Sequence, residues 1–195
     1  MSFDYKITDL KFHIKNLVPK DVCKYFIDFY ESNNDSAFSE SSYKYKTNTN
    51  EQDNYKCINL SEASLTNKKF QEPLELSKRY ISIMITNYVL HIQQNICSTF
   101  NSYLIGKSSN IRIIKYKEGQ FIKDHTDVGS YTRASCTLNL NEDYEGGEFR
   151  FFNGNIKDSL KTGEAMLFPA EPIWIHGTEP ITKGTRYSIN CFLNQ

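Results

Sequence analysis

Residues 133–141, with the sequence RASCTLNLN, indicate the fold class because their apolar and polar side chains alternate. A period of two is typical of a β-strand with one buried face. Residues 185–193, TRYSINCFL, repeat this alternation. Four further short strands are predicted, at 111–117, 147–153, 165–168 and 173–176. Short strands separated by Gly, Pro, Asn or Asp predict an antiparallel sandwich or barrel, with the two polar strand faces lining a wet cavity.

Two amphipathic helices are predicted ahead of the strands. The first has Pro19 near its first turn and ends near residues 32–34. The second is predicted over residues 72–102, where apolar side chains recur at steps of three and four and require a flat apolar partner. Between the helices, residues 32–67 are rich in Ser, Asn, Lys, Thr and Glu, and isolated Tyr and Ile are compatible with short strands. Loops or a mobile flap are expected there.

The charges of the chain cancel, with 23 Lys and Arg against 23 Asp and Glu. Nucleic acid is therefore not a favoured partner, since binding through a general positive field requires clustered basic residues. The five Cys are widely spaced without a Cys-x-x-Cys pair, which argues against a disulfide framework or a thiolate zinc site. The sequence has the pattern of neither a signal peptide nor a transmembrane segment, so a cytoplasmic protein without membrane contact is expected.

Three residues have the spacing of metal ligands. His125 and Asp127 form a His-x-Asp pair, whose side chains share one face if the segment is extended. His176 follows 51 residues later, at the end of a predicted strand. Two His and one carboxylate on one face of an ion form the facial triad of non-haem Fe(II) oxygenases. The alternative is that the three residues are structural: a turn residue, a cap and a core histidine bonded to backbone.

Arg186 lies ten residues after His176, in a chain with five Arg and eighteen Lys. Ser188 shares its face of the predicted strand at the step of two. A guanidinium can hold a carboxylate through two parallel hydrogen bonds, so a buried arginine here predicts an anionic ligand. The alternative is a structural ion pair with Glu148 or Glu164.

Together these motifs resemble the 2-oxoglutarate and Fe(II)-dependent dioxygenases, in particular the prolyl 4-hydroxylase type. The resemblance covers residues 111–193. It includes the metal-ligand motif, Arg186-x-Ser188, Tyr116-Lys117-Glu118-Gly119, Asn139-Leu140-Asn141 and Gly146-Gly147-Glu148. The fold that it implies is α+β and mainly β: a double-stranded β-helix, or jelly-roll and cupin-like barrel, buttressed by N-terminal helices. One dioxygenase domain over residues 1–195 is expected, with the buttress and a polar loop or flap in 1–110 and the barrel in 111–195.

The same resemblance implies the cofactors. His125, Asp127 and His176 are the expected catalytic Fe(II) ligands, with 2-oxoglutarate and O2 as cosubstrates and ascorbate as an accessory reductant. Arg186 is expected to pair with the distal carboxylate of 2-oxoglutarate, and Ser188 to add a hydroxyl donor.

Three further residues are expected around the cosubstrate. Tyr116 is similar in position to a tyrosine that lines the cosubstrate pocket in the family. Where the prolyl hydroxylases usually have Tyr-Leu-Asn, this chain has Asn139-Leu140-Asn141, so a tyrosyl hydroxyl is missing. Thr137 or Asn139 is expected to substitute for it.

The expected activity is hydroxylation of an aliphatic C–H, with a prolyl residue of a peptide or protein as the favoured substrate. In the prolyl hydroxylase type, a region such as residues 32–67 can fold over a bound peptide. One alternative keeps the enzyme class but takes a free amino acid or another small molecule as substrate. A second alternative is a catalytically silent jelly-roll module that retains the metal site only for stability.

Overall fold

A seven-stranded antiparallel sheet is the largest element of the structure, a computed structural model that describes residues 6–41 and 54–195. Its strand order is β1-β9-β5-β12-β4-β3-β2. The bounds are β1 Phe12–Ile14, β9 Ala165–Pro169, β5 Thr132–Asn139, β12 Arg186–Asn194, β4 Lys107–Tyr116, β3 Asn54–Asn59 and β2 Phe38–Ser41. Two smaller sheets consist of β10 (His176–Thr178), β7 (Phe149–Phe151) and β8 (Ile156–Asp158), and of β11 (Ile181–Lys183) and β6 (Glu145–Gly146).

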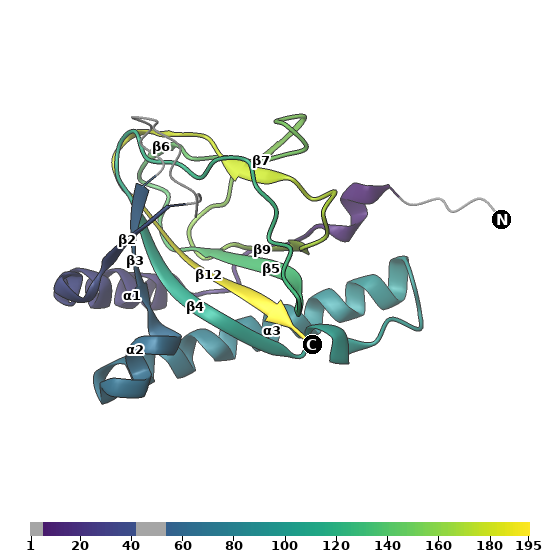
Figure 1. The fold of residues 1–195 in the computed structure, drawn as a ribbon, viewed down its shortest axis with the longest axis horizontal. Coiled ribbons are helices and arrows are strands. Elements are labelled where there is room, and N and C mark those ends of the chain that lie inside the picture. Colours follow the sequence, from purple (N-terminus) through teal and green to yellow (C-terminus); the bar gives the residue numbers. More distant parts are fainter. Residues whose placement is uncertain (1–5, 42–53) are drawn as a thin grey trace.

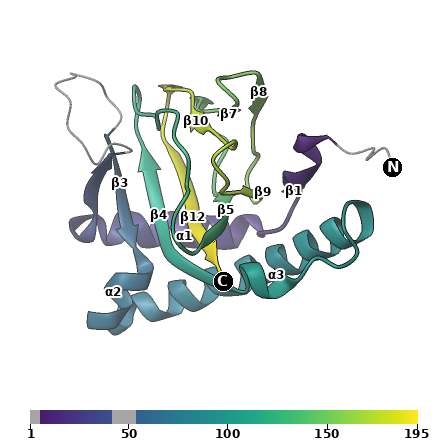
Figure 2. The ribbon, with the colours of Figure 1, turned by 45° about the vertical axis from the view of Figure 1, so that its right-hand side comes forward.

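Helices cover one face of the large sheet. The α-helices are α1 (Lys20–Ser32), α2 (Leu60–Thr66) and α3 (Gln71–Asn95), with short 3-10 helices at Ile7–Leu10, Asn34–Ser36, Lys68–Phe70 and Ser102–Ile105. Figures 1 and 2 show α1 and α3 along one side of the large sheet, with β7, β8 and β10 on the other side. The predicted α+β architecture with N-terminal helices buttressing a β-structure is therefore confirmed. No helix of the described residues is long and apolar enough to span a membrane.

The alternation in β5 and β12 divides the interior into two compartments. Their apolar side chains, such as Leu138 and Ile189, are buried against Phe26 of α1 and Met84 of α3. The polar side chains of the same strands are on the opposite face, because successive side chains of a strand point to opposite sides. Two smaller apolar clusters lie on that second face, one around Trp174. The large sheet therefore separates an apolar helix side from a mixed, partly polar side.

The second helix is shorter than predicted. α3 ends at Asn95, not at residue 102. The backbone N–H groups of Ile96 and Cys97 both donate to the carbonyl of Ile92, which closes the last turn. Phe100 still packs against the helix-side core from outside the helix. The apolar spacing therefore overestimates the length of the helix, because a residue beyond the helix end can also be buried against the core.

The polar region 32–67 contains two short strands, which its isolated Tyr and Ile allowed, and a helix that was not predicted. β2 pairs with β3, and β3 pairs with β4, so this segment adds two strands to the edge of the large sheet. α2 follows directly, and the side chain of Asn59 accepts a hydrogen bond from the N–H of Glu62 at its start. Residues 42–53, the centre of the expected flap, lie outside the described residues.

The remaining differences concern short strands. The predicted strand 147–153 is reduced to β7 and preceded by β6, because Gly146 and Gly147 both have positive φ angles. β10 begins at His176 instead of ending there, since the N–H of Trp174 donates to Glu171 and forms a turn. Strands β1, β8 and β11 were not predicted, because three residues are too few to display a period.

Candidate active site

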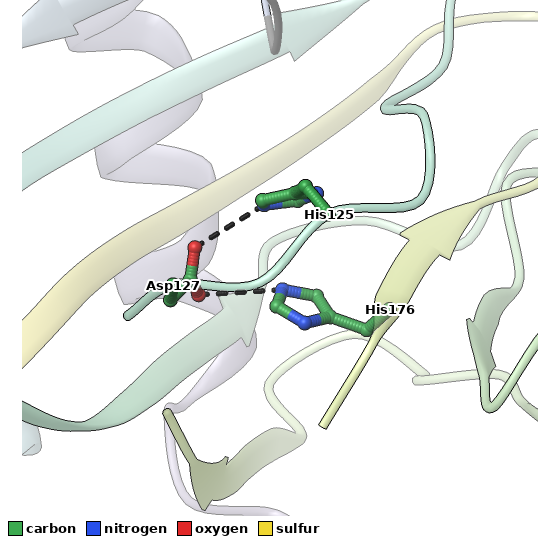
Figure 3. Close-up of side chains that lie close together, drawn as sticks. All are labelled: His125, Asp127 and His176. Carbon is green, nitrogen blue, oxygen red and sulfur yellow. Dashed lines mark ion pairs between the residues drawn. The ribbon is translucent and has the colours of Figure 1, made fainter. Parts of the chain in front are cut away.

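Two backbone hydrogen bonds bring the predicted metal ligands together. His125 and Asp127 lie in the connection between β4 and β5, and His176 is the first residue of β10. The backbones of His125 and His176 exchange two hydrogen bonds of 2.9 Å as an isolated antiparallel bridge. Gly177 allows this approach, since a Cβ there would lie 2.7 Å from the carbonyl oxygen of Ile122. Figure 3 shows both imidazoles directed toward the Asp127 carboxylate.

The geometry of the three side chains fits a metal ion. The Nε2 atoms of His125 and His176 lie 3.2 and 3.3 Å from the two carboxylate oxygens of Asp127. The Nδ1 atoms lie 2.8 Å from the carbonyl of Lys123 and 2.9 Å from that of Trp174, respectively. A protonated Nδ1 leaves the Nε2 lone pair free to coordinate, the arrangement common for metal-bound histidine. His125, Asp127 and His176 thus form a candidate facial triad.

The carboxylate of Asp127 is held in its charged form. Burial by itself would raise the pKa of this group, but the imidazoles of His125 and His176, which can donate to it from a protonated Nε2 when no metal ion is bound, lower the pKa well below its ordinary value. The hydroxyl of Ser135 on β5 also donates to Asp127, at 2.5 Å. An ionised carboxylate and two imidazole nitrogens are a donor set suited to Fe(II).

A cavity of about 380 Å³ adjoins the triad. Its lining comes from the large sheet, from residues 125–129 and from strands β7 and β10 of the three-stranded sheet. Apolar contributors include Ile114, Ile122, Phe149 and Phe168, and polar contributors include Glu40, Tyr55, Arg112, Thr137 and Asn190. A cavity therefore lies on the polar face of β5 and β12, and its lining combines polar and apolar side chains.

The predicted cosubstrate residues divide into two groups. Thr137 lines the cavity, and its hydroxyl donates to the Oδ1 atom of Asn190 at 3.1 Å. Ser188 is fully buried, and its hydroxyl donates to the same oxygen at 2.9 Å. The other three, Tyr116, Asn139 and Arg186, are buried next to Ser188 on the same sheet face, where Asn139 is directly opposite Ser188 and Arg186 is directly opposite Tyr116.

Arg186 is 2% exposed and is surrounded by neutral groups. Its Nε donates to Oδ1 of Asn139 at 3.1 Å, and its Nη1 donates to the carbonyl of Gly147 at 3.0 Å. The guanidinium carbon lies 5.5 Å from the ring centre of Tyr116 and 4.8 Å from that of Phe149. Within residues 6–41 and 54–195, no carboxylate forms an ion pair with Arg186. Glu164, one alternative partner, pairs with His13 instead, at 3.0 Å.

Asn139 orients Arg186, and its own amide is fully used. Its Nδ2 donates to the carbonyls of Asn141 and Leu160, at 2.6 and 2.8 Å. Its Oδ1 accepts from Arg186 and from the hydroxyl of Tyr144, the latter at 3.3 Å. Sequence reasoning missed Tyr144, although a tyrosine just ahead of the Gly146-Gly147 pair was an available signal.

Glu40, Tyr55 and Arg112 were also missed as contributors to the cavity. Glu40 and Tyr55 lie in the region that was expected to form loops, on β2 and β3. Arg112 lies on β4, and its Nη1 donates to both carboxylate oxygens of Glu40, at 2.9 and 2.8 Å. The only available signal was the scarcity of arginine in the chain.

Comparison with known proteins agrees with this geometry. Residues 111–194 match the family described as the 2OG-Fe(II) oxygenase superfamily. The chain is 34% identical over 86 residues to procollagen-lysine,2-oxoglutarate 5-dioxygenase 1 of Mus musculus, a match that covers 42% of this chain and 12% of the relative. This chain thus spans about an eighth of that curated relative.

Two solved structures share the fold over nearly the whole chain. A prolyl hydroxylase from Trichoplax adhaerens, in complex with a hypoxia inducible factor oxygen degradation domain peptide fragment, has a TM-score of 0.69 at 15% identity and covers 96% of this chain and 84% of its own. A prolyl-4-hydroxylase from Pseudomonas putida has a TM-score of 0.64 at 17% identity and covers 97% of both chains. The chain therefore has the double-stranded β-helix fold of the prolyl hydroxylases, as predicted.

Proposed function

We propose that this chain, whose residues 111–194 belong to the 2OG-Fe(II) oxygenase superfamily, hydroxylates an aliphatic C–H, most favourably of a prolyl residue in a peptide or protein. The observation that carries the proposal is the His125, Asp127 and His176 cluster beside a cavity whose lining includes apolar side chains. In this proposal residues 1–195 act as one domain, in which the helices support the sheet that carries the cavity.

The three cluster residues would hold Fe(II). Their Nε2 atoms and carboxylate oxygens already face one another, and the backbone carbonyls of Lys123 and Trp174 fix the orientation of both imidazoles. Iron bound there, with 2-oxoglutarate and O2, supplies the oxidising chemistry that inserts one oxygen atom into the substrate and releases succinate and CO2. Ascorbate would serve as an accessory reductant.

Arg186 would bind the distal carboxylate of 2-oxoglutarate. Its charge is buried without an acidic partner among the described residues, and the rings of Tyr116 and Phe149 shield it from water. A charge-assisted hydrogen bond to a carboxylate would compensate the cost of this burial. Asn139 would position the guanidinium, and Ser188 and Thr137 would add hydroxyl groups along the floor of the site.

A neutral substrate side chain is favoured over a cationic one. Of the described residues that line the cavity, the carboxylates are those of Asp127 and Glu40. Asp127 belongs to the candidate triad, and Glu40 is already paired with Arg112 at 2.8 Å. A lysyl ammonium would therefore find no unpaired carboxylate there, whereas a prolyl ring suits the apolar side chains of the lining, such as Ile122, Phe149 and Phe168. The cavity lining therefore favours prolyl over lysyl substrates, despite the similarity to the procollagen-lysine dioxygenase.

Anaerobic titration with Fe(II) and 2-oxoglutarate tests the proposed enzyme class. We expect the weak visible charge-transfer band of an Fe(II)-2-oxoglutarate complex in the wild type and in Asp28→Ala, an exposed control on α1. Asp127→Ala should abolish the band. A wild type without the band would overturn the cosubstrate assignment.

Turnover separates the substrate alternatives. Succinate release coupled to O2 use should be stimulated by proline-containing peptides, with a mass gain of one oxygen atom in the peptide. Stimulation by free amino acids alone would favour the small-molecule alternative. Metal and 2-oxoglutarate binding without succinate release under any peptide or amino acid would favour the silent binding module.

A further inference from the structure

Arg112 is a second buried arginine on the cavity side of the large sheet. Its residue is 8% exposed, and it lines the same cavity as the three candidate metal ligands. In the sheet it is directly opposite Asn190 of β12 and Asn59 of β3. The guanidinium carbon lies 5.2 Å from the ring centre of Phe192, another cavity residue. Strand pairing and the contact with Phe192 therefore place this cation in the cavity wall.

One buried donor of Arg112 has no acceptor among the described residues. Nη1 donates to both carboxylate oxygens of Glu40, at 2.9 and 2.8 Å. Nε is buried and has no hydrogen-bond partner in the part of the chain that the structure describes. Leaving a buried guanidinium N–H without an acceptor is unfavourable, so such groups normally have a partner. Because Arg112 lines the cavity, a molecule that occupies the cavity is a source from which this donor could gain an acceptor.

The charge at this position identifies the kind of acceptor. Glu40 already matches the positive charge of Arg112, and the thiol of Cys57 donates to the same carboxylate at 3.4 Å. A ligand carboxylate at Nε would add a second negative charge beside Glu40, which like-charge repulsion disfavours. A neutral carbonyl oxygen accepts the hydrogen bond without this cost.

We propose that Arg112 is a substrate-orienting residue, whose Nε–H donates to a backbone carbonyl oxygen of the peptide that occupies the cavity. This inference rests on the proposed function. It assigns different ligands to the two buried arginines, with the 2-oxoglutarate carboxylate at Arg186 and the neutral peptide carbonyl at Arg112. Glu40 acts through Arg112 as a positioning residue, because it holds the guanidinium against the wall of the cavity.

Peptide binding to the Mn(II) and 2-oxoglutarate complex of the full chain tests the inference. Mn(II) keeps the complex from turning over, and the probe is acetyl-Ala-Pro-Pro-Gly-Ala-amide, measured by calorimetry. Arg112→Lys keeps a positive charge beside Glu40 but removes the Nε–H. We expect it to weaken peptide binding about tenfold, the size of one hydrogen bond to a charged group. Its 2-oxoglutarate affinity should remain that of the wild type, and Arg79→Lys, an exposed control on α3, should change neither quantity.

A thioamide scan of the peptide locates the hydrogen bond. Each carbonyl in turn is replaced by a thiocarbonyl, a weaker acceptor. One position should lose several-fold affinity for the wild type, and the loss should disappear in Arg112→Lys, as expected for a direct pair in a double-mutant cycle. If the lysine variant does not fold, Arg112→Gln with the same scan replaces it.

Each other result overturns the inference. Equal peptide affinity in wild type and Arg112→Lys would make Arg112 purely structural. A parallel loss of 2-oxoglutarate affinity would make it a cosubstrate residue. A wild type that does not bind the peptide at all would exclude this ligand class for Arg112. The enzyme class is decided separately by the anaerobic Fe(II) titration, which involves no peptide.

Discussion

Arg186 and Arg112 lie on neighbouring strands, β12 and β4, and on the same face of the large sheet. Both are more than nine-tenths buried. Arg186 bonds only to neutral acceptors in the described residues, an amide oxygen and a backbone carbonyl. Arg112 is paired with the carboxylate of Glu40. The first is a cation whose charge is uncompensated, and the second is a cation whose charge is already matched.

This difference shows how one sheet face can bind two kinds of oxygen ligand. A buried charge without a counterion is costly unless an anion binds, so Arg186 favours a carboxylate. A paired guanidinium retains directional N–H donors but has little net attraction for anions, so Arg112 favours a neutral carbonyl. The choice of partner, and not the residue type, sets the ligand preference of each arginine.

The largest expected effect is that of Arg186→Ala on 2-oxoglutarate binding. Removing the cation leaves the ligand carboxylate buried without its partner, which costs about 2–5 kcal/mol, or about 30-fold to several thousandfold in affinity. The charge-transfer titration measures it, with Arg79→Ala as the matched surface control. Unchanged affinity in Arg186→Ala would remove the distinction between the two arginines.

Gly146→Ala is expected to displace the turn whose Gly147 carbonyl accepts a hydrogen bond from Arg186. Gly146 has a φ of +79°, and a Cβ there would lie 2.3 Å from the carbonyl oxygen of Pro180. Because the clash is with backbone, the turn that presents the Gly147 carbonyl to Arg186 must move. We expect a loss of about 2–4 kcal/mol in the free energy of unfolding, measured in urea, together with weaker 2-oxoglutarate binding.

Gly154→Ala is the matched control for that substitution. Gly154 has a φ of +84° but no atom within 4 Å of the added Cβ, so only the backbone conformation is penalised. Its expected cost is about 1 kcal/mol, without effect on 2-oxoglutarate. Equal effects of both substitutions would mean that the position of the turn does not matter to Arg186.

Glu40→Gln removes the negative charge beside Arg112. Arg112 would then resemble Arg186, because each would be a buried cation bonded to a neutral amide. Removing one partner of a buried pair destabilises a protein, but the Glu40 side chain is 31% exposed, so we expect only about 1–2 kcal/mol. The free energy of unfolding in urea measures the change. Adding sulfate should recover more stability in Glu40→Gln than in the wild type, because the variant alone has an unmatched cation there. An identical response of both proteins to sulfate would show that Glu40 does not compensate Arg112.

The smallest effect is expected on the helix side of β4. Lys115 and the hydroxyl of Tyr187 both donate to Glu31 of α1, at 2.6 Å each. Burial would raise the pKa of Glu31, but these partners lower the pKa below its ordinary value of 4.5. The resulting stability is present above about pH 4.5 and is lost as the pH falls through the lower folded-state pKa.

Glu31→Gln should therefore cost less than about 1 kcal/mol at pH 7, since Glu31 is 43% exposed and solvent screens the pair. The difference from the wild type should shrink in urea denaturation as the pH falls below 4.5. A difference that grows on acidification would contradict the assigned sign. Asp28→Ala, which alters an exposed pair on the same helix, is the control.

The sequence predicted the candidate metal ligands of the site, but it did not predict all of the residues that line the adjoining cavity. His125, Asp127 and His176 were identified because metal coordination restricts residue type and spacing, and both restrictions are visible in one dimension. Glu40 and Arg112 were not identified, because they are 72 residues apart and meet only through the pairing of β2 with β3 and of β3 with β4. Sheet register is set by the whole assembly, so no local pattern reveals such a pair.

The fold was likewise predictable only where a local pattern determines the structure. The alternation in residues 133–141 and 185–193 determined two long strands, their buried faces and the general β-architecture, since a period of two has a single structural meaning. The end of α3, the three-residue strands and the regular structure within 32–67 were decided by tertiary contacts.

The sequence by itself determined which side chains can bind iron and that a buried arginine would follow them. Only the tertiary structure shows that, among the described residues, Arg186 has no acidic partner while Arg112 is paired with Glu40. That difference depends on which distant strands become neighbours, because the cost of a buried charge is set by the groups packed around it.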